Sequence, residues 1–293
     1  MDKYRVGIVG VGNMGSGMAR NLLAKGWPVA VCDIDAAKTR RLEELGAVVA
    51  ATPAQAAAES AVTIVCVVDG RQSHDVLFGK DGMASSLKPG STVMMCPTLA
   101  PEDVEGFAQS LQPLAVRLID APMSGGPARA AEGSMSLMVA CRNKVFAQHR
   151  ALLNALSDKL FHVSQKVGDG ARTKLVNNLL AGINLVGTAE VMVMAKKMGL
   201  NLETTLDVIE KSSGQSWVGS DRMRRAIAGD YAPRAHMTLL EKDTRLAVEA
   251  ARAAGCEGPL GPAASQVFAQ ASASGLAGED DAALFKWLGE AKN

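Results

Sequence analysis

Aromatic side chains make up only 4% of this chain of 293 residues, whereas hydrophobic residues of all kinds reach 48%. The hydrophobic core must therefore be mainly aliphatic, and the length gives room for about two domains. Neither sign of charge dominates, because 31 basic residues stand against 30 acidic ones. This balance argues against a nucleic-acid-binding protein, and the sequence has no block of like charges that would suggest a disordered tail.

Cysteine and histidine are few and scattered. No two cysteines have the spacing of a metal site or a redox pair, which favours small buried residues in a reduced compartment. The four histidines are equally dispersed, so we expect no metal site. The residues concerned are Cys32, Cys66, Cys96, Cys141, Cys256, His74, His149, His162 and His236.

Long hydrophobic runs are also lacking, since no uninterrupted apolar segment approaches the roughly 18 residues that a membrane-spanning helix needs. A strand pattern begins at Arg5, which leaves no room for a signal peptide ahead of it. We therefore expect a cytoplasmic protein that binds neither membranes nor nucleic acid.

Short β-branched runs alternate with helical stretches in the first half of the chain, a pattern typical of a parallel sheet covered by helices. The stretches at 13–25 and 36–45 read as helices. The expected strands are 4–9, 28–32, 48–50, 62–67, 92–96 and 117–120, with 136–140 and 159–163 as possible extensions of the sheet.

From about Gly168 the sequence changes to helical spacing of Ala, Leu, Met and Lys. Gly168-Asp169-Gly170 predicts a helix start with Asp169 near the cap, and Gly199 predicts its end. The resulting long helix, 171–198, is apolar nearly all round, which indicates burial between domains or against another subunit. We therefore expect a homodimer or homotetramer. Further helices are expected at 201–212, 220–228, 236–254, 262–274 and 281–292.

These patterns predict an α/β Rossmann-like N-terminal domain over residues 1–163 and an all-α C-terminal domain over residues 164–293, joined by the long helix. We expect the active site in the cleft between the two domains, where ligand sites often lie.

A glycine fingerprint follows the first expected strand and opens the first expected helix, the context that dinucleotide binding requires. Gly10 permits a tight turn, Gly12 lets the backbone approach a pyrophosphate, and Gly15 lets helix and strand pack closely. Asn13 and Met14 complete the turn, so the amides and positive dipole end of the helix face the phosphates.

Asp33 ends the second expected strand, where a carboxylate accepts hydrogen bonds from the adenosine ribose. A carboxylate also repels a 2′-phosphate at short range, so the sequence favours NAD over NADP. Lys38, Arg40 and Arg41 follow closely and can soften this preference, which leaves NADP possible.

Two later segments carry residues suited to chemistry on a carboxylic acid. In Asp120-Ala-Pro-Met-Ser124-Gly125-Gly126, a strand end runs into small residues whose exposed amides suit an anion, with the Ser124 hydroxyl as a further donor. A flexible turn is the alternative. In the second segment, Lys174 and Asn178 share one face of the long helix.

Lys174 is polar in an otherwise apolar run, which is costly unless the charge is used. A positioned lysine can exchange the proton of a hydroxyl group during hydride transfer, and Asn178 can orient the same substrate oxygens. The alternative is a lysine whose charged end simply reaches solvent.

Taken in order, these motifs resemble the β-hydroxyacid dehydrogenase family, which includes 3-hydroxyisobutyrate, tartronate semialdehyde and threonate dehydrogenases. The resemblance covers nearly the whole chain. It rests on Gly10-x-Gly12-x-Met14-Gly15, Asp120-Ala-Pro-x-Ser124-Gly125-Gly126, Lys174-x-x-Asn177-Asn178 and Lys242-Asp243.

The resemblance implies that Lys174 is the catalytic lysine, that Ser124, Gly125 and Gly126 bind the substrate carboxylate, and that Asn178 orients the substrate. It also implies further contacts with the cofactor and a structural role for a C-terminal aspartate. Lys242 would reach the cofactor, Thr98 would lie near the nicotinamide, Val67 and Val68 would cover the adenosine, and Asp281 would be the structural aspartate.

Some positions depart from the family pattern and leave the substrate open. Val68-Asp69 stands where Leu-Pro is common, and Pro97 where Ser is common. A stretch that is commonly Phe-rich reads 235–238 Ala-His-Met-Thr, and a proline usual around 222–224 is missing. The segment before Ala100-Pro101 leans toward the threonate-like members.

We therefore expect an NAD-dependent oxidoreductase that interconverts a small hydroxy acid and its oxo acid or semialdehyde, with Lys174 as acid and base. The substrate would be similar to 3-hydroxyisobutyrate or a sugar acid of three or four carbons. The alternatives are a non-catalytic dinucleotide-binding protein, disfavoured by the presence of Lys174, and an imine reductase, in which that lysine is usually replaced.

Overall fold

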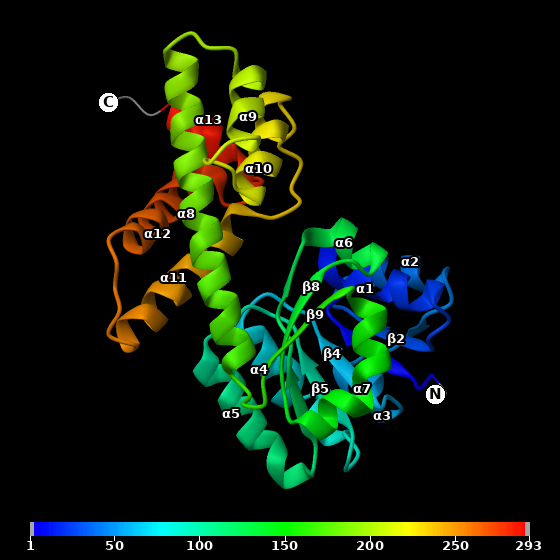
Figure 1. Ribbon diagram of the computed structural model, residues 1–293. Coiled ribbons are helices and arrows are strands. Elements are labelled where there is room, and N and C mark those ends of the chain that lie inside the picture. The colour runs from blue at the N-terminus through cyan, green and yellow to red at the C-terminus, as the bar shows by residue number, and fades with distance from the viewer. Residues whose placement is uncertain (1–2, 291–293) are drawn as a thin grey trace. The chain divides into compact units, whose positions relative to one another are not determined.

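The computed structural model describes residues 3–290. The chain forms two compact units that divide between Lys174 and Leu175, and Figure 1 shows the elements of each. The first unit extends past the boundary expected at residue 163. It includes the start of the long helix α8 (Asp169–Lys197), because Ala171 packs in the core beside the sheet.

The first unit is built on a sheet of nine strands in the order β3-β2-β1-β4-β5-β6-β8-β7, with β9 paired to β8. The strands from β3 to β6 run parallel, as the alternation of strands and helices predicts. The bounds are β1 Val6–Val9, β2 Val29–Cys32, β3 Val48–Val49, β4 Val62–Val65, β5 Thr92–Met95, β6 Arg117–Asp120, β7 Met123–Ser124, β8 Ser136–Ala140 and β9 Lys159–Ser164.

The last three strands depart from the parallel pattern. Strand β8 is antiparallel to β6, and the short strand β7, which the sequence pattern did not indicate, is antiparallel to β8. Strand β9 then pairs parallel to β8. The extension of the sheet by 136–140 and 159–163 is confirmed, but β8 runs against β6 because the chain reverses between β7 and β8, where α6 lies.

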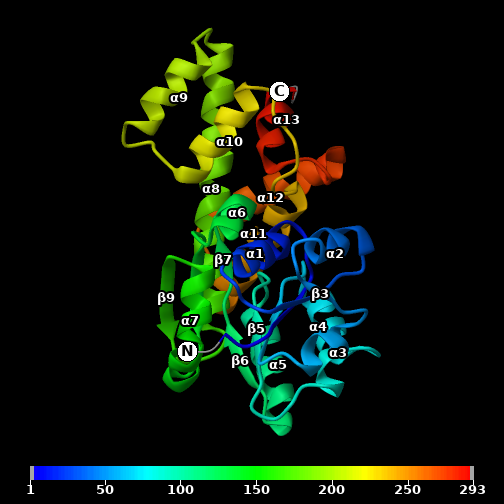
Figure 2. The same cartoon turned by 90° about the vertical axis from the view of Figure 1, so that its right-hand side faces the viewer.

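Helices cover both faces of this sheet (Figures 1 and 2), so its central strands are apolar on both sides. One face packs against α1 and α7 through residues such as Met18, Leu22 and Leu152. The other face packs against α3, α4 and α5 through residues such as Leu77 and Phe107. The bounds are α1 Asn13–Ala24, α2 Ala36–Glu43, α3 Pro53–Ala58, α4 Gly70–Phe78, α5 Pro101–Leu111, α6 Gly126–Glu132 and α7 Asn143–Leu156.

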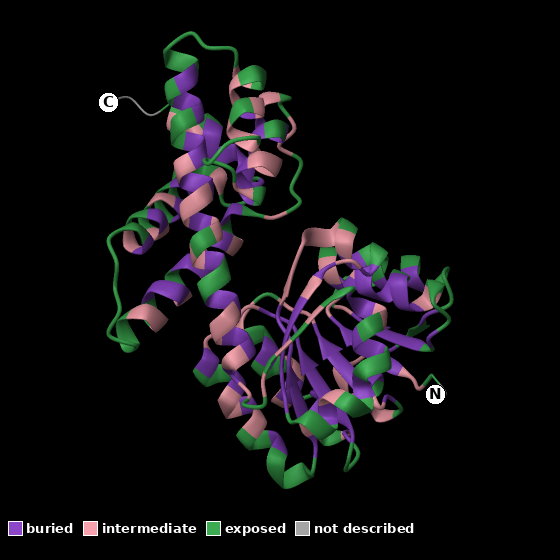
Figure 3. Ribbon diagram, viewed as in Figure 1, coloured by how far each residue is buried: buried purple, intermediate pink, exposed green. Residues whose placement is uncertain are grey.

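The second unit is helical, as expected. Its core is aliphatic apart from Phe268 and Phe285, and α8 contributes Leu185, Ala189 and Met192 to it. Buried and exposed residues alternate along its helices in Figure 3. The other bounds are α9 Leu202–Glu210, α10 Trp217–Ile227, α11 Met237–Ala253, α12 Leu260–Ala271 and α13 Leu284–Glu290.

By length and overall composition, α8 meets the criterion for a membrane-spanning helix, although no uninterrupted apolar run of that length was expected. That expectation considered only uninterrupted apolar runs, and α8 is interrupted by Lys174, Asn177 and Asn178. A helix whose apolar residues form the core of a folded unit passes the same test.

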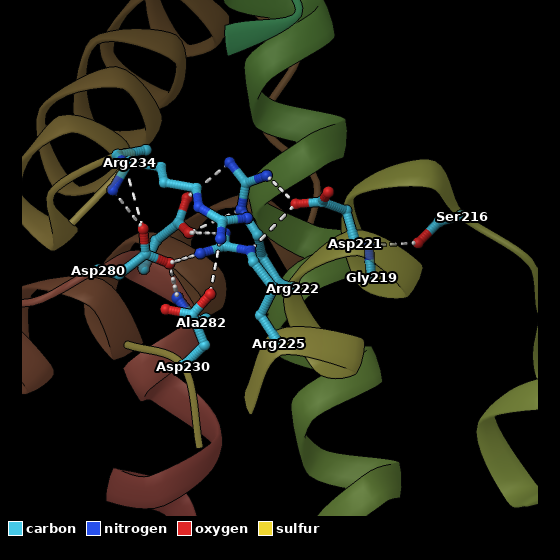
Figure 4. A network of polar contacts seen from close by, with 11 residues as sticks. Ser216, Gly219, Asp221, Arg222, Arg225, Asp230, Arg234, Asp280 and Ala282 are labelled. Atoms are coloured by element: carbon cyan, nitrogen blue, oxygen red, sulfur yellow. Dashed lines mark hydrogen bonds and ion pairs between the residues drawn. The ribbon is translucent and has the colours of Figure 1, made fainter. Parts of the chain in front are cut away.

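A buried charge network holds the second unit together near the start of α11 (Figure 4). Asp280 is fully buried and accepts hydrogen bonds from Arg225 Nη1 at 2.9 Å and from the backbone amides of Arg234 and Ala235. Asp281 accepts from Arg222 Nε at 2.7 Å and Nη2 at 3.2 Å. The Asp280 carboxylate thereby fixes the segment that leads into α11, and the Asp281 carboxylate holds Arg222 of α10.

The cysteines are free thiols, and four of them are buried or half-buried. Cys256 is exposed, so the expectation that all five are buried is wrong for this residue. It lies in the segment between α11 and α12.

Candidate dinucleotide and substrate site

The glycine fingerprint lies between β1 and α1, next to the position where the strand order reverses from β2-β1 to β1-β4. Ligands of open α/β sheets bind at such a position, outside the carboxyl ends of the strands. The turn therefore lies where a dinucleotide site is expected.

The absence of a Cβ has a different consequence at each glycine of the turn. Gly10 has a φ of +90°, and a Cβ there would lie 2.5 Å from the Cys66 carbonyl oxygen. A Cβ on Gly15 would lie 2.0 Å from the Gly10 carbonyl oxygen, so the start of α1 can approach the end of β1 only without a side chain. A Cβ on Gly12 would meet no protein atom within 4 Å, which leaves its surroundings open to a ligand.

The start of α1 suits a phosphate. Its N-cap is Gly12, which has no side chain to cap the helix, and its first turn contains no acidic residue. Asn13 and Met14 are the first two residues of the helix. Amides at such a helix start bind anions, so these residues fit the pyrophosphate of a dinucleotide.

Asp33 directly follows β2 and braces the turn. Its Oδ2 accepts a hydrogen bond from the Val11 amide at 2.7 Å, and its Oδ1 accepts one from the Asp35 amide at 2.9 Å. A carboxylate has further lone pairs, so these bonds leave room for a ribose hydroxyl. The sequence did not indicate the bond to Val11, which joins residues that are 22 positions apart.

The other predicted cofactor residues of the first unit also follow strand ends. Val67 and Val68 lie after β4, and Val68 is 49% exposed. Asp69 stands where Pro is common in the family, and it has a local function here. Its side chain caps α4 by accepting a hydrogen bond from the Gln72 amide at 2.8 Å. Thr98 lies after β5 and is half-buried. These strands are parallel neighbours, so both segments share the edge that carries the glycine turn.

The Ser-Gly-Gly loop connects β7 to α6. Ser124 pairs with Ser136 of β8, while Gly125 and Gly126 have φ values of +129° and +77°. Two successive residues in this region favour glycine, and they turn the chain sharply into α6. A Cβ on Gly126 would meet no protein atom within 4 Å, so the loop is open at this point.

Helices α1 and α6 are closely packed, which links the glycine turn to this loop. A Cβ on Gly17 would lie 2.9 Å from the Ala130 Cβ and 3.0 Å from the Pro127 carbonyl oxygen. The cofactor turn and the Ser124 loop therefore belong to one rigid part of the first unit.

The start of α8 is held by an aspartate from β6. Asp120 Oδ2 accepts hydrogen bonds from the backbone amides of Gly168 at 2.9 Å and Ala171 at 3.0 Å. Asp169, which the sequence places near the cap, instead directs its carboxylate to Arg172 Nη1 at 3.2 Å. The helix start at Gly168-Asp169-Gly170 is confirmed, but its capping side chain is Asp120.

Lys174 is only 7% exposed and lies one helical turn after Gly170. Asn178 lies one turn further along α8, so the two predicted residues share a helix face. Asn178 Nδ2 donates to Asp243 Oδ2 at 2.6 Å, and Lys242 Nζ donates to Asp243 Oδ1 at 2.7 Å. Asp243 therefore organises two of the predicted residues of the second unit.

The sequence pairs Lys242 with Asp243 by adjacency but does not indicate the bond from Asp243 to Asn178. That bond fixes the amide of Asn178, since Asn178 Oδ1 also accepts from Asn177 Nδ2 at 3.0 Å. Asn178 Oδ1 is thus the atom of this side chain that can accept a hydrogen bond from a hydroxyl group.

Together, the parallel sheet, the glycine turn and the helical second unit define a dinucleotide-binding protein of the oxidoreductase type. Residues 5–164 match the family described as the NAD binding domain of 6-phosphogluconate dehydrogenase. Residues 168–288 match the family described as NAD-binding of NADP-dependent 3-hydroxyisobutyrate dehydrogenase.

Individual relatives match nearly the whole chain. L-threonate dehydrogenase of Cupriavidus necator is 34% identical, over 96% of this chain and 95% of the relative. A crystal structure of 3-hydroxyisobutyrate dehydrogenase from Salmonella typhimurium has a TM-score of 0.91 and 34% identity, covering 97% of this chain and 100% of the other. A structure of Psf3 in complex with NADP+ and 2-OPP has a TM-score of 0.90 and 28% identity, covering 97% and 99%.

This chain belongs to the β-hydroxyacid dehydrogenase family. The resemblance inferred from the order of the sequence motifs is therefore confirmed, as are the fold class and the use of NAD or NADP.

Proposed function

We propose that this chain oxidises a small hydroxy acid reversibly with NAD or NADP, and that Lys174 exchanges the proton of the reacting hydroxyl group. The observation that carries the proposal is a lysine only 7% exposed in the same unit as a glycine turn suited to a dinucleotide. Burying an ammonium group is costly, so a use for it is expected. The dehydrogenase activity of the relatives supports this assignment.

The roles of the other residues follow from their donors and acceptors. The Ser124 hydroxyl and the amides of Gly125 and Gly126 bind the carboxylate of the substrate. Asn178 Oδ1 accepts a hydrogen bond from a substrate hydroxyl, and Asp243 holds it in place. The nicotinamide, when bound, supplies the hydride chemistry. Lys174 accepts the hydroxyl proton during oxidation as a neutral amine, which becomes an ammonium group, and the ammonium group returns the proton during reduction.

The cofactor residues are Gly10, Gly12 and Gly15, Asn13 and Met14 at the helix start, and Asp33 at the ribose. Val67, Val68, Thr98 and Lys242 complete the set by resemblance to the family. We propose a preference for NAD, because the Asp33 carboxylate repels a 2′-phosphate and is held in place by the Val11 amide.

The proposed substrate is a hydroxy acid of three or four carbons, close to a sugar acid such as threonate. The L-threonate dehydrogenases at 34% identity favour this class. A panel of 2- and 3-hydroxy acids tests it through initial rates with NAD and with NADP. Absence of turnover across the panel would exclude the dehydrogenase function.

Lys174→Ala tests the role of the lysine. Since a general acid–base group contributes about 10²–10⁴-fold, kcat should fall by that factor while NADH binding, followed by fluorescence titration, is retained. Lys166→Ala is the matched control, because the Lys166 side chain is exposed and its Nζ forms a loose ion pair with Glu105 Oε1 at 3.9 Å. A Lys174→Ala variant with wild-type kcat would refute the proposed mechanism.

We also propose that the protein acts as a homodimer or homotetramer formed through α8. Five large apolar residues of this helix are 41–73% exposed, and they lie within an arc of about 60° at 3.6 residues per turn. An exposed apolar stripe of this length is typical of an interface. The residues are Val176, Leu180, Val191, Met194 and Met198.

Light scattering coupled to size-exclusion chromatography measures the oligomeric state. The wild-type protein should elute above its chain mass of 30.5 kDa, and Val191→Lys combined with Met194→Lys should shift it toward the monomer. Lys196→Ala, on the same helix, is the control. A wild-type monomer at micromolar concentration would refute the proposal.

A further inference from the structure

Asp120 is a buried carboxylate for which the proposed chemistry has no use. It is 1% exposed and ends β6, where it lies in register with Met95 of β5 and Ala140 of β8. The strand is therefore fixed on both sides. A side chain at this position is held by the sheet and can serve as a rigid reference point.

From this position Asp120 accepts hydrogen bonds from the backbone amides at the first turn of α8. Its two hydrogen bonds, to the Gly168 and Ala171 amides, span 48 and 51 positions of the chain. A third amide, that of Gly170, also bonds to this carboxylate. Burial raises the pKa of Asp120 to about 6, and these three bonds act in the opposite direction by favouring the ionised form.

The helix start is shaped for this contact. A Cβ on Gly170 would lie 2.9 Å from the Asp120 carboxyl carbon and 2.8 Å from the Met138 carbonyl oxygen. Gly168 has a φ of +98°, a conformation that side chains rarely adopt. Gly170 therefore permits an approach between helix and strand that a side chain would oppose, and Gly168 supplies the backbone conformation that precedes it.

Lys174 lies one turn beyond this contact. Because residues four apart share a helix face, Gly170 and Lys174 are on the same side of α8. Any shift or rotation of the first turn would move the lysine with it. The Ser124 loop is fixed separately, through the pairing of β7 with β8.

We propose that Asp120 is a positioning residue for the reaction: it holds the first turn of α8 against the end of β6 and thereby sets the place of the Lys174 ammonium group. This inference rests on the proposed function of Lys174. It predicts an effect on the chemical step and not on the binding of either reactant, because the glycine turn and the Ser124 loop have their own supports.

The test replaces Asp120 by Asn, which has nearly the same volume. Its amide oxygen can keep two of the bonds, but its NH₂ group faces a third amide that also needs an acceptor. We expect kcat to fall by about 10- to 100-fold, as for a misplacement of about 1 Å. The KM of the hydroxy acid and the NADH dissociation constant should stay within about threefold of wild type.

Asp169→Asn is the matched control. It makes the same substitution in the same helical turn, but its carboxylate pairs with Arg172 at the surface. Its kcat should remain within about twofold of wild type. All rates are taken at a temperature where circular dichroism shows each variant fully folded, so that a loss of helix stability alone leaves kcat unchanged.

A D120N variant with near wild-type kcat but a lower melting temperature would overturn the proposal, as would a raised KM with unchanged kcat. If D120N does not fold, the Gly170→Ala variant tests the proposal instead, because the added Cβ would push the helix away from an intact Asp120. A fall in kcat then supports the proposal, and an unchanged kcat overturns it. Full activity of Lys174→Ala would instead refute the proposed function itself.

Discussion

His149 offers a stability measurement with a defined sign. Its side chain is 1% exposed on α7, with Nδ1 at 2.7 Å from the Tyr4 hydroxyl and Nε2 at 3.0 Å from Thr92 Oγ1. Burial, aided by the charge of Arg117, lowers the pKa of His149 to about 4. The folded protein therefore keeps the ring neutral at a pH where the unfolded chain protonates it.

The direction of the effect follows from this difference. The stabilising contribution is fully present above the unfolded value of 6.5 and is lost as the pH falls toward 4. One pKa unit corresponds to about 1.4 kcal/mol, so the contribution lost across this range is about 3 kcal/mol. His149→Gln removes the titrating group and should remove this dependence.

Urea unfolding at several pH values between 4 and 7.5 measures the effect. Trp27, whose ring meets that of Tyr4 at 5.3 Å, reports on this region once Trp217 and Trp287 are replaced by Phe. The difference in unfolding free energy between this background and its His149→Gln variant isolates His149 from the other groups that titrate in the range.

The unfolding free energy of the background minus that of its His149→Gln variant should fall by about 3 kcal/mol from pH 7.5 to pH 4, because only the background loses the contribution of a neutral His149. The exposed His74, replaced by Gln in the same background, controls for loss of a histidine as such. A difference that stays constant over the whole range would refute the reasoning that His149 is neutral in the folded protein.

Three further predictions concern the turn, the cofactor preference and the second unit. Gly15→Ala should weaken NADH binding at least tenfold in a fluorescence titration, because its Cβ would lie 2.0 Å from the Gly10 carbonyl oxygen. Asp33→Ser should shift the kcat/KM ratio toward NADP by about tenfold, since a like-charge repulsion is removed; an unchanged ratio would contradict the assignment. Asp280→Ala should lower the unfolding free energy by about 3–5 kcal/mol, because Arg225 loses its buried partner, and a loss below 1 kcal/mol in chemical denaturation would count against this.

Much of the fold was predictable because its signals are local. The strand at 117–120 and the extension at 136–140 match β6 and β8 residue for residue, and α8 begins within two residues of the predicted helix. β-branched runs, glycine stops and helical spacing suffice for such assignments. Strand β7 was missed because two residues carry no periodicity.

The candidate site was predictable in part. The glycines of the turn and of the Ser-Gly-Gly loop could be named from their spacing, and the positive φ values of Gly10, Gly125 and Gly126 and the close contact at Gly15 give the physical reason for four of them. The functions of Asp120 and Asp243 could not be assigned. An aspartate in the sequence carries no sign of which distant amide or side chain it will meet.

The sequence by itself determined the class of protein, because glycines, strand residues and helix residues act through their own backbone conformations. The tertiary structure alone decided how the residues proposed for chemistry are held. Asp120 reaches α8 across 48 positions, and Asp243 reaches Asn178 across 65. Such contacts depend on how strands and helices pack, and packing joins residues whose separation in the sequence has no period to detect.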